Sequence, residues 1–442
     1  MVILIKLKTI YIMLKKLFGY DPTKTTVRTE LLAGLTTFLT MSYILAVNPA
    51  MFSQLDGMSA GAVFTATALA AIIGTVAMAL LAKMPFGLAP GMGLNAFFVY
   101  TVCMGMGYSW QFALTAVLIE GLIFILLTVT NVREAIVNAI PAALKNAIGA
   151  GIGLFIAFVG LQNAGVIIDN SATLVSLGEI THGSALLACI GLVITAVMVA
   201  KNVRGAMLIG ILVTTLIGIP MGITEWGGLV SLPQSIKPIL FQFEWQNIFT
   251  LDMLAVVFTF LFIDLFDTVG TLVGVCLKAN MIGPDGQIPR LKQAFMADAI
   301  ATTVGACIGT STTTTYVESA SGVTQGGRTG LTAFVAACCF AVALFFSPLF
   351  LAIPAAATAP VLVIVGLFML EPVRNIPFND FSESIPAFVC IIAMPLSYSI
   401  SDGILLGMIS YVLINLCCGR VKKIPVVTGI LAVLFILKYI FI

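Results

Sequence analysis

Six acidic residues of this sequence lie inside strongly apolar stretches, where a charged side chain is costly. They are Glu120, Asp252, Asp264, Asp267, Asp298 and Glu318. No Lys or Arg lies in the middle of these stretches to neutralise them. Burial without a counter-charge favours the protonated form of a carboxyl group, so each is a candidate proton carrier. An ionised carboxylate can also accept hydrogen bonds from the N–H groups of a ligand.

Asp267 and Glu318 are the strongest candidates for a site. Asp264 and Asp267 are three residues apart, so a helix would place both on one face. Asp264 is then either a third proton-coupling carboxyl or a residue that orients its neighbour. Asp252 falls near the end of its stretch, where water reaches it. For Glu120 and Asp298 we favour a structural role, with hydrogen bonds between helices.

Two segments contain residues that break a spanning helix. Residues 86–98 include Pro90 and clustered glycines, and residues 309–319 include the run Thr312-Thr313-Thr314-Thr315. Pro90 and Thr312 lie 222 residues apart, about half the chain. Paired broken segments predict a binding site near the membrane midplane, where half-helix N–H groups face the ligand. The alternative is a pair of packing kinks.

The residues around these breaks suit a planar, uncharged, hydrogen-bonding solute. Asn95 can both donate and accept, and backbone N–H groups can donate to a carbonyl. Flat surfaces for stacking come from Phe97, Phe98, Phe266 and Tyr316. An anion is poorly served by carboxylates with no basic partner. These residues therefore predict a proton-coupled carrier of a small polar solute.

The composition sets the environment of this chemistry. Of the 442 residues, 60% are hydrophobic and 9% charged, and the mean hydropathy is +1.13, which indicates a polytopic membrane protein. A net charge of +2 does not favour nucleic acid as a partner. The nine cysteines have no metal-binding spacing, and His182 is the only histidine. We therefore expect no metal or other cofactor and no enzymatic nucleophile–base pair.

Apolar runs predict fourteen membrane spans. They are 28–47, 62–82, 87–104, 110–130, 142–162, 183–200, 205–222, 250–277, 294–310, 312–325, 328–350, 355–371, 385–400 and 402–419. The last two would be joined outside at Ser401-Asp402-Gly403. If both ends are cytoplasmic, Lys237 is the only Lys or Arg in an outward loop, as short-loop charge statistics require. The stretch 424–442 either spans or lies on the surface, and the basic segment 1–27 lies on the inner leaflet.

The two halves echo each other. Thr37-Phe38-Leu39 recurs as Thr259-Phe260-Leu261, and the string AIPAA at 139–143 recurs at 352–356. With seven spans in each half, an odd number, a duplication must be inverted. Inverted repeats are an architecture of secondary transporters.

Five motifs, in order along the chain, resemble the azaguanine-type purine permeases of the nucleobase:cation symporter superfamily. They read RTELLAGLTTFLTMSYILAVNP, LAPGMGLNAFF, LKNAIGAGIGLFIAFVGLQNAG, FLFIDLFDTVGTLVG and GTSTTTTYVESASGVTQGGRTG. The resemblance extends from about Thr26 to the C-terminus. It implies an all-α polytopic fold of fourteen segments in two inverted repeats of seven, with short strands in segments 3 and 10.

The resemblance also implies domains, a site and partners. A core domain would comprise 28–130 and 250–350, and a gate domain 142–222 and 355–442. The substrate-binding residues would be Asn95, Asp267 and Glu318. A homodimer through the gate domain and an elevator-like movement are further implications.

The sequence thus predicts a multi-pass cell-membrane importer of hypoxanthine or guanine, and of adenine as a further candidate, by proton symport. An anion carrier on a similar scaffold is the rival; it requires a basic residue facing the cavity, for which Arg328 is the nearest candidate. A channel or a membrane enzyme is less consistent with these residues.

Overall fold

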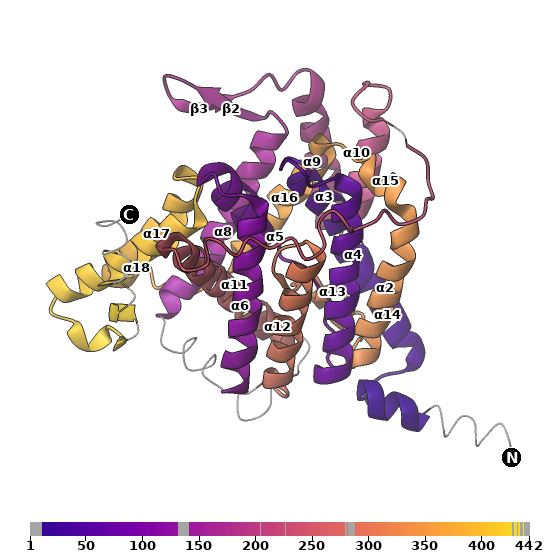
Figure 1. Ribbon diagram of the computed structural model, residues 1–442, viewed down its shortest axis with the longest axis horizontal. Coiled ribbons are helices and arrows are strands. Elements are labelled where there is room, and N and C mark those ends of the chain that lie inside the picture. Colours follow the sequence, from indigo (N-terminus) through magenta and orange to yellow (C-terminus); the bar gives the residue numbers. More distant parts are fainter. Residues whose placement is uncertain are drawn as a thin grey trace, which may run out of the picture.

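The structure is a computed structural model that describes most of the chain as packed helices (Figure 1). The described residues are 11–130, 141–203, 205–225, 227–278, 281, 288–426, 428–430, 432–433 and 436. Long helices such as α4, α6, α12 and α14 run side by side through the body of the molecule, and α17 and α18 lie at one flank.

The first half of the chain contributes seven segments. The first is α2 (Val27–Met41), which breaks at Ser42 and Tyr43 and continues as α3 (Ile44–Phe52). The others are α4 (Ala60–Ala77) with the π-helical η1 (Met78–Ala82); β1 (Leu88–Pro90), α5 (Met92–Ala96) and the π-helical η2 (Phe97–Gly105); α6 (Trp110–Val129); α8 (Ala142–Asn163); α9 (Gly183–Ala200); and α10 (Ala206–Gly218).

The second half contributes seven segments of the same kind. They are α11 (Leu251–Lys278); α12 (Leu291–Ile308); β4 (Thr313–Thr315) with α13 (Ser319–Thr324); α14 (Gly330–Ala343), η3 (Leu344–Phe346) and α15 (Ser347–Leu351); α16 (Ala355–Met369) with η4 (Glu371–Asn375); α17 (Phe381–Leu396); and α18 (Ile400–Cys417), followed by η5 (Val421–Lys423).

The described residues therefore confirm the predicted fold class: fourteen mostly helical segments with short strands in the third and the tenth. Seven described helices are long and apolar enough to cross a membrane, and shorter apolar helices include Met92–Gly105 and Phe381–Leu396. The molecule is a multi-pass membrane protein. The break in the third segment follows from Pro90, which has no N–H to continue a helix, and from its glycine neighbours.

Two details differ from the sequence-based expectation, and the predictions for the two chain ends are largely untested. Asp402 and Gly403 lie in the first turn of α18 rather than in a connection; the turn is at Ser397–Ser399, where the Ser399 side chain caps the helix. An exposed hairpin of β2 (Ile167–Asn170) and β3 (Leu174–Leu177) between α8 and α9 was not predicted. Most of 424–442 and residues 1–10 lie outside the described residues.

The packing of the helices follows the internal repeat. Helix α6 packs against α12, and its counterpart in the second half, α14, packs against α4. In the same way α14 contacts α2 while α6 contacts α11, and α8 packs against its own counterpart α16. Each of these contacts in one half therefore has an equivalent contact between the corresponding helices of the other half. The strands β1 and β4, one from each half, pair in antiparallel register. The two halves are therefore inverted repeats.

Two acidic residues occupy matching positions in this arrangement. Glu30, in the first turn of α2, accepts hydrogen bonds from the backbone N–H of Arg328 at 3.0 Å and of Thr332 at 3.1 Å, and so holds the start of α14. Asp252, 222 residues later in the first turn of α11, accepts a hydrogen bond from Tyr108 just before α6. The first segment of each repeat thus bonds to the start of the fourth segment of the other repeat.

Close packing joins α2 to α13 through a glycine. A Cβ added at Gly322 would lie 2.0 Å from Thr37 Oγ1 and 2.7 Å from the carbonyl oxygen of Ala33. By contrast, nothing lies within 4 Å of a Cβ added at Gly149 in α8. The backbones of α2 and α13 therefore approach as closely as they do because residue 322 has no side chain.

This contact predicts a stability difference between two glycine variants. Gly322→Ala must push α2 away from α13, and we expect the free energy of unfolding in detergent to fall by about 1–3 kcal/mol. Gly149→Ala meets open space and gains helix propensity, so its melting temperature should equal or exceed that of the wild type. Thermal unfolding of both purified proteins measures this, and equal melting temperatures would contradict the packing argument.

Candidate functional site

The crossing of β1 and β4 lies at the centre of the molecule and is completely buried. Leu88, Ala89 and Pro90 face Thr315, Thr314 and Thr313. The ladder extends at both ends: Gly91 N donates to Thr312 O and Tyr316 N to Gly87 O, each at 3.0 Å. These bonds pair the backbone N–H and C=O groups on the facing edges of the two strands, which have no water to bind inside the membrane.

On the outer edge of each strand, a threonine from a neighbouring helix forms hydrogen bonds with backbone groups. The Thr75 hydroxyl of α4 accepts from Leu88 N at 2.9 Å and donates to Leu88 O at 3.0 Å. The Thr302 hydroxyl of α12, in the other repeat, donates to Thr313 O at 3.0 Å. The crossing is thus attached to α4 and α12 as well as to itself.

Asn95 and Tyr316 converge on the end of β1. The Tyr316 hydroxyl donates to the carbonyl oxygen of Pro90 at 2.5 Å, and Asn95 Nδ2 reaches the same oxygen at 3.4 Å. The Ser311 hydroxyl donates to Asn95 Oδ1. The structure therefore places two predicted site residues, from different repeats, on one backbone carbonyl.

Glu318 stands immediately before α13 and is 7% exposed. Its Oε1 accepts a hydrogen bond from the Tyr43 hydroxyl at 2.8 Å. The Tyr43 and Tyr316 rings have centroids 6.3 Å apart, so both aromatic side chains border this carboxylate.

Asp267 comes from α11 and reaches the same region. Its Oδ2 would lie 3.8 Å from a Cβ at Gly91, directly after β1. The carboxyl groups of Asp267 and Glu318 interact electrostatically with each other and with the Tyr316 hydroxyl. The two carboxylates singled out by the sequence are therefore brought together at the β1–β4 crossing, with Asn95 and Tyr316 beside them.

A second group of acids lies behind β4. The Thr268 hydroxyl of α11 is 3.0 Å from Asp264 Oδ1, 3.1 Å from Asp298 Oδ2 of α12 and 2.7 Å from the Thr314 hydroxyl. Glu120 of α6 accepts from the Thr312 hydroxyl at 2.6 Å. Glu120 and Asp298 are thus hydrogen-bonded between segments, as the sequence predicted, and both hold the chain around β4.

Comparison with known proteins identifies the family. The sequence profile of the Permease family (Xan_ur_permease) matches residues 28–406. This chain belongs to that family. MJ0326 of Methanocaldococcus jannaschii is 47% identical to the permease over 97% of this chain and 98% of its own length. The guanine/hypoxanthine permease PbuG of Bacillus subtilis is 45% identical, over 97% and 100%, and the adenine permease AdeP of Escherichia coli is 43% identical, over 97% and 96%. These relatives are transporters and not enzymes.

Solved structures support the fold. The transmembrane domain of the cyanobacterial bicarbonate transporter BicA superimposes with a TM-score of 0.64 at 17% identity, covering 87% of the permease and 98% of that domain. SLC26A9 superimposes with a TM-score of 0.66 at 11% identity, covering 93% of the permease and 70% of that chain. At such low identity the likeness concerns the fold alone.

The aromatic residues predicted for the site do not all lie at the β1–β4 crossing. Tyr316 lies at the crossing, as described. Phe98 is completely buried, with its ring centroid 4.9 Å from that of Phe52 and 6.4 Å from that of Phe260, so here it packs within the permease core. Phe266 lies in α11, and its side chain is outside the described part of the chain.

Three polar residues at the site were not predicted: Tyr43, Thr268 and Ser311. A signal for Tyr43 exists in the repeat, because 222 residues later the chain reaches Leu265, between the two aspartates of α11. Tyr43 therefore falls at the depth of the carboxylates. Thr268 and Ser311 carry no comparable signal, since their roles depend on which segments pack together.

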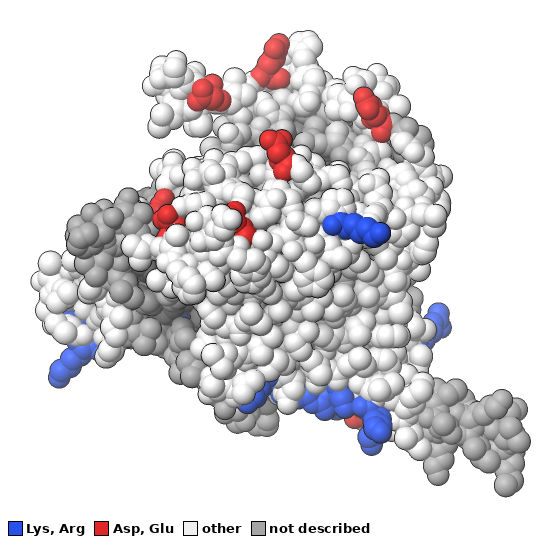
Figure 2. Space-filling view, in the orientation of Figure 1, with Lys and Arg blue, Asp and Glu red and all other residues white. Residues whose placement is uncertain are grey.

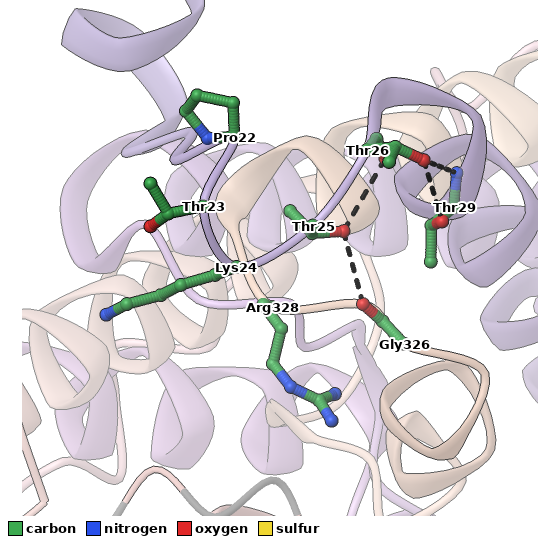
Figure 3. Close-up of a pocket in the computed structure, with 8 residues that line it drawn as sticks. All are labelled: Pro22, Thr23, Lys24, Thr25, Thr26, Thr29, Gly326 and Arg328. Atoms are coloured by element: carbon green, nitrogen blue, oxygen red, sulfur yellow. Dashed lines mark hydrogen bonds between the residues drawn. The ribbon is translucent and has the colours of Figure 1, made fainter.

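Arg328 does not lie at the β1–β4 crossing. It lines a surface pocket with Thr25, Thr29 and Gly326, beside the start of α2 (Figure 3). Its Nη1 donates to the carbonyl oxygens of Val323 at 2.6 Å and Gly327 at 2.7 Å. The guanidinium thus fixes the end of α13 and does not serve as the basic group that an anion carrier would place at this crossing.

The position of Thr268 predicts an effect on stability. Thr268→Val removes the hydroxyl that joins two carboxyl groups to β4, and we expect the free energy of unfolding to fall by about 1–3 kcal/mol. Thr259→Val in the same helix is the control, because that hydroxyl only donates to Ala255 O of its own helix, at 2.8 Å. Thermal unfolding in detergent compares the two; an equal small loss would mean that Thr268 has no special role.

Proposed function

We propose that the protein imports purine nucleobases, hypoxanthine or guanine and also adenine as a candidate, across the cell membrane by proton symport. The observation that carries the proposal is the meeting of Asp267, Glu318, Asn95 and Tyr316 at the β1–β4 crossing. The substrate class is supported by two relatives that align with almost all of this chain, the guanine/hypoxanthine permease PbuG and the adenine permease AdeP.

The chemistry of the site suits a purine base. Carboxylates accept hydrogen bonds from ring and exocyclic N–H groups, and an amide such as that of Asn95 can pair with either a donor or an acceptor. Tyr316, with Phe98 and Phe266 as further candidates, offers a flat surface for stacking. Recognition of a neutral base leaves the site's negative charge to be balanced by a proton.

A group of buried acids lies beside the site, behind β4. The Thr268 hydroxyl lies within 3.1 Å of carboxyl oxygens of both Asp264 and Asp298, and near the Thr314 hydroxyl. Carboxyl groups that lie this close together in a buried region favour protonation of one of them. This supports proton coupling at the site, with Asp264, Asp267 and Glu318 as the candidate carriers.

The segments that hold the site suggest how it moves. We infer a core domain of residues 28–130 and 250–350, which contains both strands, and a gate domain of residues 142–222 and 355–442. Proton and purine binding would neutralise the core and let it slide past the gate in an elevator-like step. The gate domain would form the homodimer contact.

Surface charge supports an orientation. Figure 2 shows most Lys and Arg near the lower end of the molecule and Asp and Glu toward the upper end. Because Lys and Arg accumulate in cytoplasmic loops, the lower end, with the N-terminal segment, would be cytoplasmic. In the described part of that segment, Leu14 and Phe18 pack toward α14 while Lys15 and Lys16 are exposed, as expected of a helix on the inner leaflet.

Uptake of radiolabelled hypoxanthine into proteoliposomes tests the function. Wild-type uptake should saturate and be driven by an inside-alkaline pH gradient. Asp267→Ala and Glu318→Gln should each lose at least about tenfold, because each removes a charged hydrogen-bond acceptor from the base. Competition with unlabelled guanine and adenine ranks the substrates.

Glu179→Gln is the control, since that carboxylate lies in an exposed loop beside His182. It should transport like the wild type. Wild-type rates in both site variants would end the proposal, and uptake of chloride or bicarbonate without proton movement would favour an anion carrier instead.

A further inference from the structure

Tyr43 interrupts the first spanning segment at the depth of the site. It stands with Ser42 at the break between α2 and α3, and its side chain is 1% exposed. Its hydroxyl donates to Glu318 Oε1 at 2.8 Å. Glu318 Oε1 is the only hydrogen-bond partner of this hydroxyl among the described residues. A phenol proton buried here without an acceptor would cost free energy, so the contact requires Glu318 to present an oxygen lone pair.

The surroundings of this contact are closely packed. The Thr40 hydroxyl, one turn before Tyr43, lies 3.3 Å from the carbonyl oxygen of Glu318, although the carbonyl oxygens of Thr36 and Thr37 in its own helix are closer. Earlier in α2, Ala33 and Thr37 pack against Gly322 of α13. Glu318 is therefore held to the first segment through its side chain and through the helix that follows it. Any movement of the core would carry Tyr43 and Glu318 together.

We propose that Tyr43 is a positioning residue that keeps Glu318 as the ionised hydrogen-bond acceptor for the purine, while the transported proton resides on other carboxyl groups. The inference rests on the proposed function and assigns separate roles to its acids. The other titratable groups that face Glu318 are Asp267 from α11 and Tyr316 after β4. Of these, Asp267 is the other carboxyl group, and it also interacts electrostatically with Asp298. The proposal places the transported proton on Asp267.

The hydrogen bond has a predictable effect on pH dependence. A donor favours the ionised form of a carboxyl group, so Tyr43→Phe makes Glu318 easier to protonate. If the Glu318 oxygen that faces the base becomes protonated, it turns into a donor and no longer accepts an N–H from the base. The acidic limb of purine binding, which is the pH range where binding is lost as the pH falls, should therefore move upward by about one pH unit. A shift of this size corresponds to the loss of one hydrogen bond to a charged group. The alkaline limb of uptake, set by the proton carrier, should stay in place.

Equilibrium binding of radiolabelled hypoxanthine to purified full-length protein, measured from pH 4 to 9, gives the acidic limb. Proton-driven uptake into proteoliposomes over the same range gives the alkaline limb. Tyr100→Phe is the matched control: Tyr100 is also a buried spanning tyrosine, but its hydroxyl accepts from Gln54 and Asn163 and, within the described part of the chain, bonds to no acid. Its limbs should coincide with those of the wild type.

The outcomes separate this inference from the proposed function. An acidic limb that stays in place in Tyr43→Phe overturns the inference, and so does an alkaline limb that moves, which would make Glu318 the proton carrier. If the wild type neither binds hypoxanthine nor responds to a pH gradient, the proposed function itself fails. Should Tyr43→Phe be too unstable to purify, Tyr43→Met removes the same donor with an apolar side chain, and its acidic limb should move upward in the same way.

Discussion

The need to satisfy backbone polar groups inside the bilayer governs this structure. Two segments leave the helical conformation at the centre of the molecule, and each exposed N–H or C=O there would cost several kcal/mol. The solution is mutual: β1 and β4 bond to each other, and Thr75 and Thr302 bond the outer edges. Neither strand could form without the other repeat. The inverted duplication is therefore a requirement of the site and not only a trace of its history.

That arrangement explains why the polar side chains gather where they do. Each strand is followed by a half-helix, and the residues at these transitions, Asn95 in one repeat and Glu318 in the other, both lie buried beside the crossing. The long helix α11 completes the site because it passes beside both, with Asp267 toward β1 and Thr268 toward β4. The backbone arrangement is symmetric, but the site is not, since its two carboxylates, Asp267 and Glu318, both come from the second repeat.

The frame could be predicted from the sequence. Apolar runs located the fourteen segments to within a few residues, because each must bury its length in lipid. Pro90 with its glycine neighbours and the threonine run located the two breaks, and the strands at these breaks were expected from the family resemblance. Asp267 and Glu318, which the sequence singled out, do come together in the structure. The sequence could not reveal Tyr43, Thr268 or the position of Arg328, since these depend on distances between segments far apart in the chain. The Ser401-Asp402-Gly403 turn was wrong because the Ser399 cap starts α18 earlier than hydropathy suggests.

The attachments of the crossing also restrict how a substrate could be released. β1 is bonded to β4 and α4, and β4 to α12 and, through Thr314, to α11; Glu318 is tied to the first segment by Tyr43. A hinge within the site would break several buried hydrogen bonds at once, each without water to replace them. Moving the whole bonded unit past its neighbours breaks none of them. The hydrogen bonds that make irregular backbone tolerable in the membrane are therefore easier to reconcile with the proposed elevator-like movement than with local opening, and such a movement would carry Tyr43 and Glu318 together.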